Sequence, residues 1–200
     1  MGAGADVVPI CYRIGVEISI APTIRRAQPS DTAALTDLVN RAYAVEAFFV
    51  DGQRTTADEI AGLIRSGGFL VLECAGGIGA AVLFEGPGEH RGLPPSAYLG
   101  AYFGMLSVLP ELQGMGLGGR LVRVAEAMAE ATGATSMRLR VINLRGELVR
   151  WYRSLGYREV GTAPYHHGSV KRPCHFIEMA KSLMPISTAY AATSGEVGAA

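Results

Sequence analysis

The sequence lacks an excess of charge of either sign, because its 18 basic residues are matched by 18 acidic residues. A protein that recruits nucleic acid or an anionic membrane through a broad electrostatic field usually carries a clear positive surplus. The sequence therefore predicts neither nucleic acid nor a membrane as a partner. It also lacks any uninterrupted apolar run that approaches the ~18 residues needed to span a bilayer, so no transmembrane segment is expected.

Cysteine is scarce, with only Cys11, Cys74 and Cys174 in 200 residues. An odd number of cysteines without the close spacing of metal ligands favours neither a disulfide framework nor a metal site. The first residues lack a positively charged segment that leads into an apolar stretch and a cleavage site. We therefore expect a reduced, cytoplasmic protein that holds no metal.

The patterning along the chain predicts one folded domain with an extension at each end. Residues 1–20 show no sustained period, and residues 185–200 are mostly small. Residues 21–184 hold the periodic segments, and this length is sufficient to bury one sizeable core. We expect both extensions to be loosely held.

Apolar periodicity between the extensions predicts alternating strands and helices. Thr56 followed by Glu59 fits a capping box at the start of a helix, and Gly76 with Gly77 suits a tight hairpin turn. The apolar run from Tyr98 to Leu109 predicts a central strand that is covered on both faces. The order is strand, helix, helix, three strands, helix, strand, helix and two strands, which indicates a mixed α/β domain.

A glycine-rich stretch between a buried strand and an amphipathic helix is the most informative part of the sequence. It consists of Gln113, Gly114, Met115, Gly116, Leu117, Gly118, Gly119 and Arg120. Several backbone NH groups can converge on one anion where no side chain blocks the approach, and a helix N-terminus adds partial positive charge. Arg120 can add a charge-assisted hydrogen bond. The stretch therefore predicts a pyrophosphate-binding loop.

The same glycines allow two other interpretations. Gly114, Gly116 and Gly119 also spell the Gly-x-Gly-x-x-Gly pattern of dinucleotide-binding Rossmann domains. Such a domain normally has an acidic residue ~20 residues further on, at the end of the next strand, where this chain has Asn143. A purely structural glycine-rich turn is the second alternative.

The loop resembles the coenzyme A loop of the GNAT superfamily of N-acetyltransferases, whose motif reads Gln/Arg-x-x-Gly-x-Gly/Ala. Gln113, Gly116 and Gly118 fill those places. The stretch from Trp151 to Tyr157 resembles the second signature of that superfamily, Leu/Phe-Tyr-x-x-x-Gly-Phe/Tyr. Together with the element order, the resemblance covers roughly residues 23–181.

This resemblance implies a mixed, mostly antiparallel seven-stranded sheet flanked by about four helices. It also implies an enzyme that moves an acetyl group from acetyl-CoA to an amine by direct attack in a ternary complex, with acetyl-CoA as its only cofactor. The balanced charge favours a small-molecule amine over a protein as acceptor, and the protein is expected to be a monomer or a homodimer. A non-catalytic acyl-CoA-binding sensor or regulatory module with the same fold is the alternative.

The resemblance assigns roles to the central strand and to a tyrosine. Leu106, Ser107 and Val108 occupy the segment that offers backbone groups to the pantetheine arm, and one of their NH groups is the candidate oxyanion donor. Gly100 and Gly104 could permit the bulge that frees these groups. Tyr152 is the candidate general acid for the leaving thiolate, because a phenol with a pKa of about 10 is protonated at neutral pH. Packing of its ring in the core is the alternative.

The sequence offers two further candidate site residues, a glutamate and an asparagine. Glu46 follows the first helix within an aromatic segment and is the candidate base, either by binding the acceptor ammonium or by relaying its proton through water. A solvated surface glutamate is the alternative. Asn143 is a candidate pantetheine contact, although the superfamily usually places this asparagine where the present chain has Arg145. A turn asparagine at the strand end is the alternative.

Overall fold

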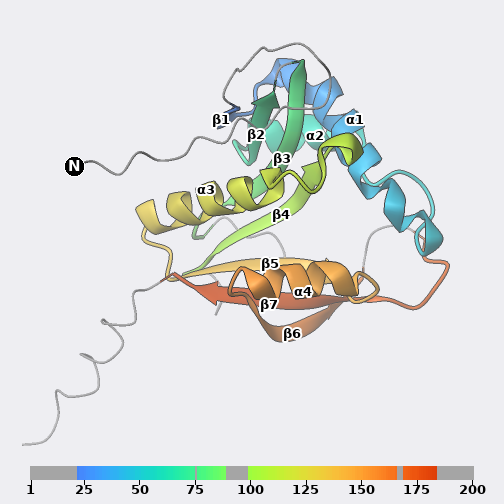
Figure 1. Cartoon of the computed structure of the whole chain (residues 1–200), viewed down its shortest axis with the longest axis vertical. Helices are drawn as coiled ribbons and strands as arrows, with labels where there is room; N and C mark the ends of the chain where they lie inside the picture. Colours follow the sequence, from blue (N-terminus) through green and yellow to red (C-terminus); the bar gives the residue numbers. More distant parts are fainter. Residues whose placement is uncertain (1–21, 75, 89–98, 166–168, 184–200) are drawn as a thin grey trace, which may run out of the picture. The chain divides into compact units, whose positions relative to one another are not determined.

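The computed structural model describes residues 22–74, 76–88, 99–165 and 169–183. Within these ranges it contains seven strands and four α-helices in the predicted order (Figure 1). The strands are β1 (Thr23–Arg26), β2 (Phe69–Cys74), β3 (Gly77–Glu85), β4 (Ala101–Val108), β5 (Ser136–Ile142), β6 (Arg158–Pro164) and β7 (His175–Ser182). The helices are α1 (Thr32–Tyr43), α2 (Ala57–Arg65), α3 (Leu117–Ala131) and α4 (Gly146–Ser154), with short 3-10 helices η1 (Pro29–Asp31), η2 (Ala44–Phe48) and η4 (Pro110–Leu112). The predicted extensions, residues 1–20 and 185–200, lie outside the described residues.

The strands form a seven-stranded sheet in the order β1-β2-β3-β4-β5-β7-β6. The pairs β1/β2, β2/β3, β5/β7 and β6/β7 are antiparallel, whereas β4 and β5 are parallel and are connected through α3. A parallel pair requires such a crossover, while antiparallel neighbours can be joined by a short turn. The mixed, mostly antiparallel sheet predicted from the sequence is confirmed.

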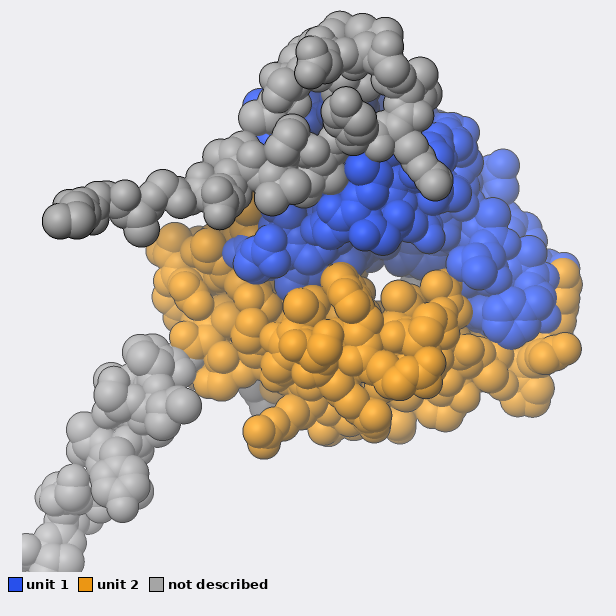
Figure 2. Space-filling model, viewed as in Figure 1, with its two compact units in different colours: residues 1–83, 105–123 blue, residues 84–104, 124–200 orange. Residues whose placement is uncertain are grey.

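Packing divides the chain into two compact units (Figure 2). Unit 1 comprises residues 1–83 and 105–123, and unit 2 comprises residues 84–104 and 124–200. The strand β4 and the helix α3 therefore each contribute residues to both units. None of the helices in the described ranges is long and apolar enough to cross a bilayer.

The core of unit 1 forms between two helices and the strands that they cover. Its buried side chains are Leu35, Leu38 and Val39 of α1, Ile60 and Ile64 of α2, Phe69 and Val71 of β2, Ala81 and Leu83 of β3, and Met105 of β4. Thr56 caps α2, because its side chain accepts a hydrogen bond from the NH of Glu59 at 3.2 Å. The reciprocal half of the predicted capping box differs, since the Glu59 carboxylate accepts instead from the Thr55 hydroxyl at 2.7 Å.

Glycines end several elements where the sequence places them. Gly76 and Gly77 have φ angles of 108° and 128°, which fits the predicted tight turn between β2 and β3. Gly133 and Gly156 have φ angles of 78° and 93° shortly after α3 and α4. The residue that ends each helix in the left-handed conformation is therefore a glycine, which adopts it without steric strain.

The strand β4 departs from its predicted environment. Its residues alternate between buried and half-buried from Ala101 to Val108, with Phe103, Met105 and Ser107 on the buried side. The expectation that both faces are covered is wrong, because the second face of the strand is only partly covered. An apolar run does not distinguish a strand buried on both faces from one whose second face carries apolar residues in partial contact with solvent.

Candidate functional site

The glycine-rich loop is anchored at the end of β4. The NH of Leu109 donates to the carbonyl of Gly79 in β3 at 3.0 Å. The Gln113 side chain reaches back, and its Nε2 donates to the carbonyl of Val108 at 3.2 Å. Gln113, the first residue of the predicted motif, therefore closes the loop onto the strand that precedes it.

A second anchor ties the loop to α1. Arg41 donates from Nη2 to both carboxylate oxygens of Glu111, at 2.9 and 3.0 Å. The pKa of Glu111 is lowered by a hydrogen bond from its own backbone NH and then by Arg41. Both side chains are largely exposed, so this pair positions the loop more than it stabilises the fold.

Two glycines give the loop its shape. Gly114 and Gly116 both have φ angles of 79°, a conformation that other residues rarely adopt. A Cβ atom placed on either of them would meet nothing within 4 Å. Backbone conformation, and not crowding, therefore requires glycine at both positions, and the space beside the loop backbone is open.

The first turn of α3 begins directly at this loop. The first intrahelical hydrogen bond runs from the NH of Arg120 to the carbonyl of Gly116 at 3.1 Å. The NH groups of the three residues between them precede that bond, so the helix itself offers them no acceptor. No acidic residue lies in the first turn, and the buried Leu117, 2% exposed, holds the turn in place. The arrangement suits an anion.

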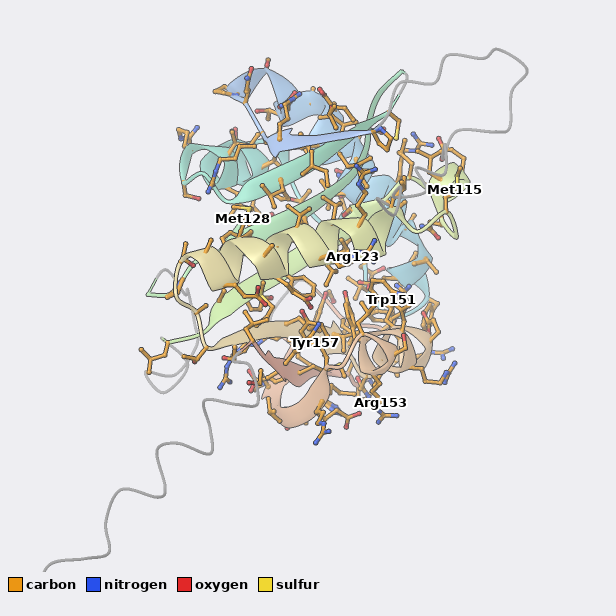
Figure 3. All side chains as sticks on the ribbon, turned by 60° about the vertical axis from the view of Figure 1, so that its left-hand side comes forward. Met115, Arg123, Met128, Trp151, Arg153 and Tyr157 are labelled. Atoms are coloured by element: carbon orange, nitrogen blue, oxygen red, sulfur yellow. The ribbon has the colours of Figure 1, made fainter. Side chains whose placement is uncertain are left out.

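Basic side chains follow on the same helix. Arg120 is half-buried and Arg123 is exposed, and neither has an acidic partner among the residues that the structure describes. Figure 3 shows Arg123 on α3. Its guanidinium lies beside Gly119, since a Cβ there would be 3.6 Å from Nη1. Positive side chains near a helix N-terminus are unfavourable by themselves and become favourable when an anion is bound.

Backbone strain lies in β4, next to the segment predicted to contact the pantetheine arm. Met105 has a φ angle of 47°, although it is not a glycine and is only 7% exposed. The fully buried Ser107 donates from Oγ to the carbonyl of Met105 at 3.0 Å and so supports this conformation. The sequence suggested that Gly100 and Gly104 would permit the irregularity, but the left-handed residue is the methionine that follows Gly104.

Gly104 has a different role. A Cβ on this residue would lie 2.9 Å from the Tyr102 hydroxyl and 3.0 Å from its ring. Glycine at position 104 therefore makes room for the tyrosine, while Met105 carries the change in backbone direction. Residues held in sparsely populated conformations often occur at functional sites, which supports a functional role for the adjoining segment, Leu106 to Val108.

Glu46 lies in η2 and is only 8% exposed. The alternative of a solvated surface glutamate is therefore wrong. Its carbonyl accepts hydrogen bonds from the NH groups of Phe49 and Val50, which holds the short helix together. Two neighbours, Val45 and Phe48, are 54% and 45% exposed, so a buried carboxylate lies within an apolar surface segment of unit 1.

Tyr152 lies on α4 in unit 2 and is 6% exposed. Its ring centroid lies 4.8 Å from that of Trp151, 5.9 Å from that of Phe103 and 6.0 Å from that of Tyr157. The packing that the sequence offered as an alternative is thus present. A packed ring and a reactive hydroxyl are compatible, and the catalytic role of Tyr152 stays a prediction.

Asn143 extends the pairing of β5 with β7. Its NH donates to the carbonyl of His175 at 3.0 Å, and its side-chain Oδ1 accepts from the NH of His175 at 3.0 Å. Asn143 therefore has the structural role at a strand end that the sequence offered as the alternative. Because a carbonyl oxygen can accept two hydrogen bonds, a contact with a pantetheine arm could use either Nδ2 or Oδ1, and this contact also stays a prediction.

The sequence did not indicate a polar network between α3 and the last strands. Tyr157 donates from its hydroxyl to Glu126 at 2.7 Å, and Lys181 donates to the other oxygen of the same carboxylate at 2.8 Å. Burial, and then the hydrogen bond to Glu126, raise the pKa of Tyr157 well above its usual value. These residues are 31 and 55 positions from Glu126, so no local spacing could have revealed them.

No group of three His, Cys, Asp or Glu side chains within the described ranges is placed to hold a metal ion. Cys74 and Cys174 form no disulfide and are half-buried. The chemistry that the described site residues can offer is therefore that of backbone NH groups, guanidinium groups, a buried carboxylate and a phenol.

Comparison with known proteins gives a family match to part of the chain and a fold. Residues 65–159 match the family described as the acetyltransferase (GNAT) domain. Comparison with curated proteins by sequence gives no match.

The fold is similar to several solved structures. The structure of yncA from Salmonella typhimurium, which contains its cofactor acetyl-CoA, has a TM-score of 0.65 at 23% identity and covers 82% of this chain and 95% of its own. The ribosomal-protein-S18-alanine N-acetyltransferase of Escherichia coli has a TM-score of 0.64 at 19% identity, with 81% and 94% covered. An N-acetyltransferase of Staphylococcus aureus Mu50 has a TM-score of 0.65 at 17% identity, with 82% and 99% covered. The predicted GNAT-like fold is confirmed.

Proposed function

We propose, from the match of residues 65–159 to the acetyltransferase (GNAT) domain, that the protein transfers an acetyl group from acetyl-CoA to an amine in a ternary complex. The observation that carries the proposal is the start of α3. There, Gly114 and Gly116 open the backbone, and the helix begins without an acidic residue. A pyrophosphate would accept hydrogen bonds from the NH groups of residues 117–119 and from Arg120.

The reaction needs an oxyanion donor, a base and an acid, and the chain has a candidate for each. The amine nitrogen attacks the thioester carbonyl, and a backbone NH of Leu106 to Val108 would stabilise the resulting oxyanion. The carboxylate of Glu46 would take up the proton that the amine loses, directly or through water. As the carbon–sulfur bond breaks, the Tyr152 hydroxyl would donate its proton to the leaving thiolate. Free CoA and the acetylated amine are the products.

We propose a small-molecule amine as the acceptor, because the balanced composition gives no field to recruit a strongly charged protein. One structural neighbour is an N-acetyltransferase of a ribosomal protein, so peptides belong in the same screen. A panel of small amines and peptides, scored by release of free thiol from acetyl-CoA, separates the two classes. Binding of CoA without thiol release on any member would favour the sensor alternative.

The donor site is tested by two matched glycine variants. Gly116 and Gly133 lie at opposite ends of α3 and have φ angles of 79° and 78°, and a Cβ added to either would meet no atom within 4 Å. Alanine at either position should cost a similar ~1 kcal/mol of strain. Only Gly116→Ala should weaken CoA binding, by about tenfold or more in calorimetry, because one or more charged hydrogen bonds are lost.

Equal CoA affinity in the Gly116→Ala and Gly133→Ala proteins would place the donor elsewhere. Thermal denaturation of both variants supplies the control, since their unfolding temperatures should fall by the same amount. This measurement distinguishes a loss of ligand contacts from a general loss of structure.

A further inference from the structure

A half-buried arginine of unit 2 has one buried guanidinium nitrogen without a hydrogen-bond partner in the described structure. Arg138 lies on β5, and its Nε is buried without a hydrogen-bond partner. The guanidinium is always charged, and buried polar groups without partners are rare in folded proteins. Among the described residues, Arg138 also forms no ion pair. This group calls for an acceptor that the described part of the chain does not supply.

The strand register places a second arginine on the same face. Arg138 is paired with Tyr102 of β4 and with Ala180 of β7, and Ala180 is paired with Arg158 of β6. Residues that pair across neighbouring strands point to the same face of a sheet. Only the small Ala180 therefore separates Arg138 from Arg158, whose Cα atoms are about 10 Å apart by two strand spacings. Two long guanidinium side chains can converge above the alanine.

The next row on this face is already neutralised. Arg140 donates to Oε1 of Glu178 from Nε at 2.9 Å and from Nη2 at 2.7 Å. In the strand register, Glu178 is the acidic residue nearest to Arg138 on this face. Its carboxylate is already paired with Arg140. Glu159 points to the other face, where Arg153 of α4 binds it. Within the described ranges, no acidic side chain therefore pairs with Arg138 or Arg158.

Both helical segments in the described part of unit 2 lie on the opposite face. Tyr157 and Lys181 meet Glu126 of α3, and Phe103 meets Tyr152 of α4. Figure 1 shows α4 lying over β5, β7 and β6. The arginine face carries instead a small hollow of about 10 Å³. It is lined by Tyr102, Arg138, Leu139, Arg140, Val160, Glu178 and Met179. The hollow has room for about one water-sized group.

We propose that this face binds a small oxyanion, a carboxylate or a phosphate, between Arg138 and Arg158. The buried Nε of Arg138 would donate to one oxygen, which fills the hollow, and Arg158 would hold the group from the exposed side. Guanidinium groups match the oxygens of carboxylates and phosphates in pairs. The size of the hollow favours a small ion over a segment of protein. This site is separate from the acetyl transfer proposed above and does not depend on it.

The test uses the full chain and two probes, inorganic phosphate and succinate, at constant ionic strength set with chloride. Calorimetry should show binding of at least one probe, and the tighter of the two identifies the chemistry of the ligand. Arg138→Gln and Arg158→Gln should each weaken that binding by about tenfold to a hundredfold, as expected for the loss of charged hydrogen bonds. Arg153→Gln is the matched control and should leave the affinity unchanged, because Arg153 serves the other face.

Phosphate can also bind at the start of α3, so the titration is repeated in the Gly116→Ala protein. Binding that survives there and is lost in Arg138→Gln supports the proposal. Binding that persists in Arg138→Gln, or the absence of binding by either probe, overturns it.

A stability measurement without any probe gives a second, independent readout. Arg138→Met removes a charge that lacks a partner, so it should raise the unfolding temperature in chloride buffer. A lower unfolding temperature would show that another part of the chain already satisfies the guanidinium, and this result would also overturn the proposal.

Discussion

The start of α3 in unit 1 and the aromatic cluster of unit 2 are built in opposite ways. At α3, the loop backbone faces open space, and the first NH groups of the helix have no acceptor within it. In the cluster, the rings of Phe103, Trp151, Tyr152 and Tyr157 lie 4.8 to 6.0 Å apart. One region leaves groups for a ligand to satisfy, and the other packs its aromatic rings against one another.

This difference indicates where substitutions act. Two glycines inside the first turn of a helix cost about 1 kcal/mol each relative to alanine, so the start of α3 is locally unfavourable. Glycines that lower helix stability at this point indicate a functional requirement. The open backbone suggests that this requirement is the close approach of a ligand. In a packed cluster, large effects on function should come from single polar atoms, while changes to the rings should act on stability.

The largest effect is expected from one hydroxyl of the cluster. Tyr152→Phe keeps the ring and its packing, so the fold and the CoA affinity should be unchanged. If the hydroxyl protonates the leaving thiolate, turnover should fall by roughly 10² to 10⁴. The measurement is kcat at saturating acetyl-CoA with an acceptor found in the amine screen. A wild-type kcat under conditions where chemistry limits the rate would leave Tyr152 a packing residue only.

Tyr157→Phe is the matched control within the same cluster. Its hydroxyl binds Glu126 and has no proposed role in the reaction. This variant should lose stability and keep its kcat, which is the reverse of the result expected for Tyr152→Phe.

The second effect tests whether the start of α3 gives up helix stability in order to bind CoA. Gly119→Glu introduces both a better helix former and a negative charge into the first turn. Stability without ligand should rise by about 1 kcal/mol. Affinity for CoA should fall by roughly tenfold to a hundredfold, because a carboxylate would repel the pyrophosphate where an NH group was open. If both quantities rise together, the first turn of α3 is not the phosphate site.

The third effect concerns pH and the packed cluster. The pKa of Tyr157 is raised in the folded protein, so above the ordinary tyrosine pKa of about 10 the unfolded chain binds fewer protons than the folded chain. Stability should therefore be fully present below pH 10 and should be lost as the pH rises, by about 1.4 kcal/mol per unit for this one group. Denaturant unfolding between pH 9 and 11 should show a steeper decline for the wild type than for Tyr157→Phe. Equal slopes would assign the decline to other groups.

The smallest effect comes from a helix start that is satisfied internally. Thr56 caps α2, and Asp58 and Glu59 lie in its first turn. Thr56→Ala should cost about 1 kcal/mol of stability, and CoA affinity should not change. If Thr56→Ala lowered the CoA affinity as much as Gly119→Glu does, the loss of affinity would not be specific to the start of α3. The starts of α2 and α3 would then not differ in function.

Local patterns account for what the sequence predicted correctly. The element order, the cap at Thr56 and the glycine stops at Gly133 and Gly156 each depend on residues a few positions apart. The α3 loop was recognisable for the same reason, since its glycines lie close together in the chain.

Properties set by distant segments were not predictable. The burial of Glu46 depends on the packing around η2, and the pairing of Arg138 with Ala180 depends on the strand register. The irregular residue of β4 is Met105, while the neighbouring Gly104 accommodates Tyr102. None of these facts has a signature in the spacing of residues.

The structure places two incompatible requirements on position 105, which Met105 occupies. The core of unit 1 needs an apolar side chain there, while a φ angle of 47° suits glycine. Glycine would relax the backbone and leave a void, whereas leucine or isoleucine would fill the space and keep or increase the strain. In a saturation library, the replacement closest to neutral at position 105 should therefore be leucine, which matches methionine in volume, while glycine and β-branched residues should destabilise the protein.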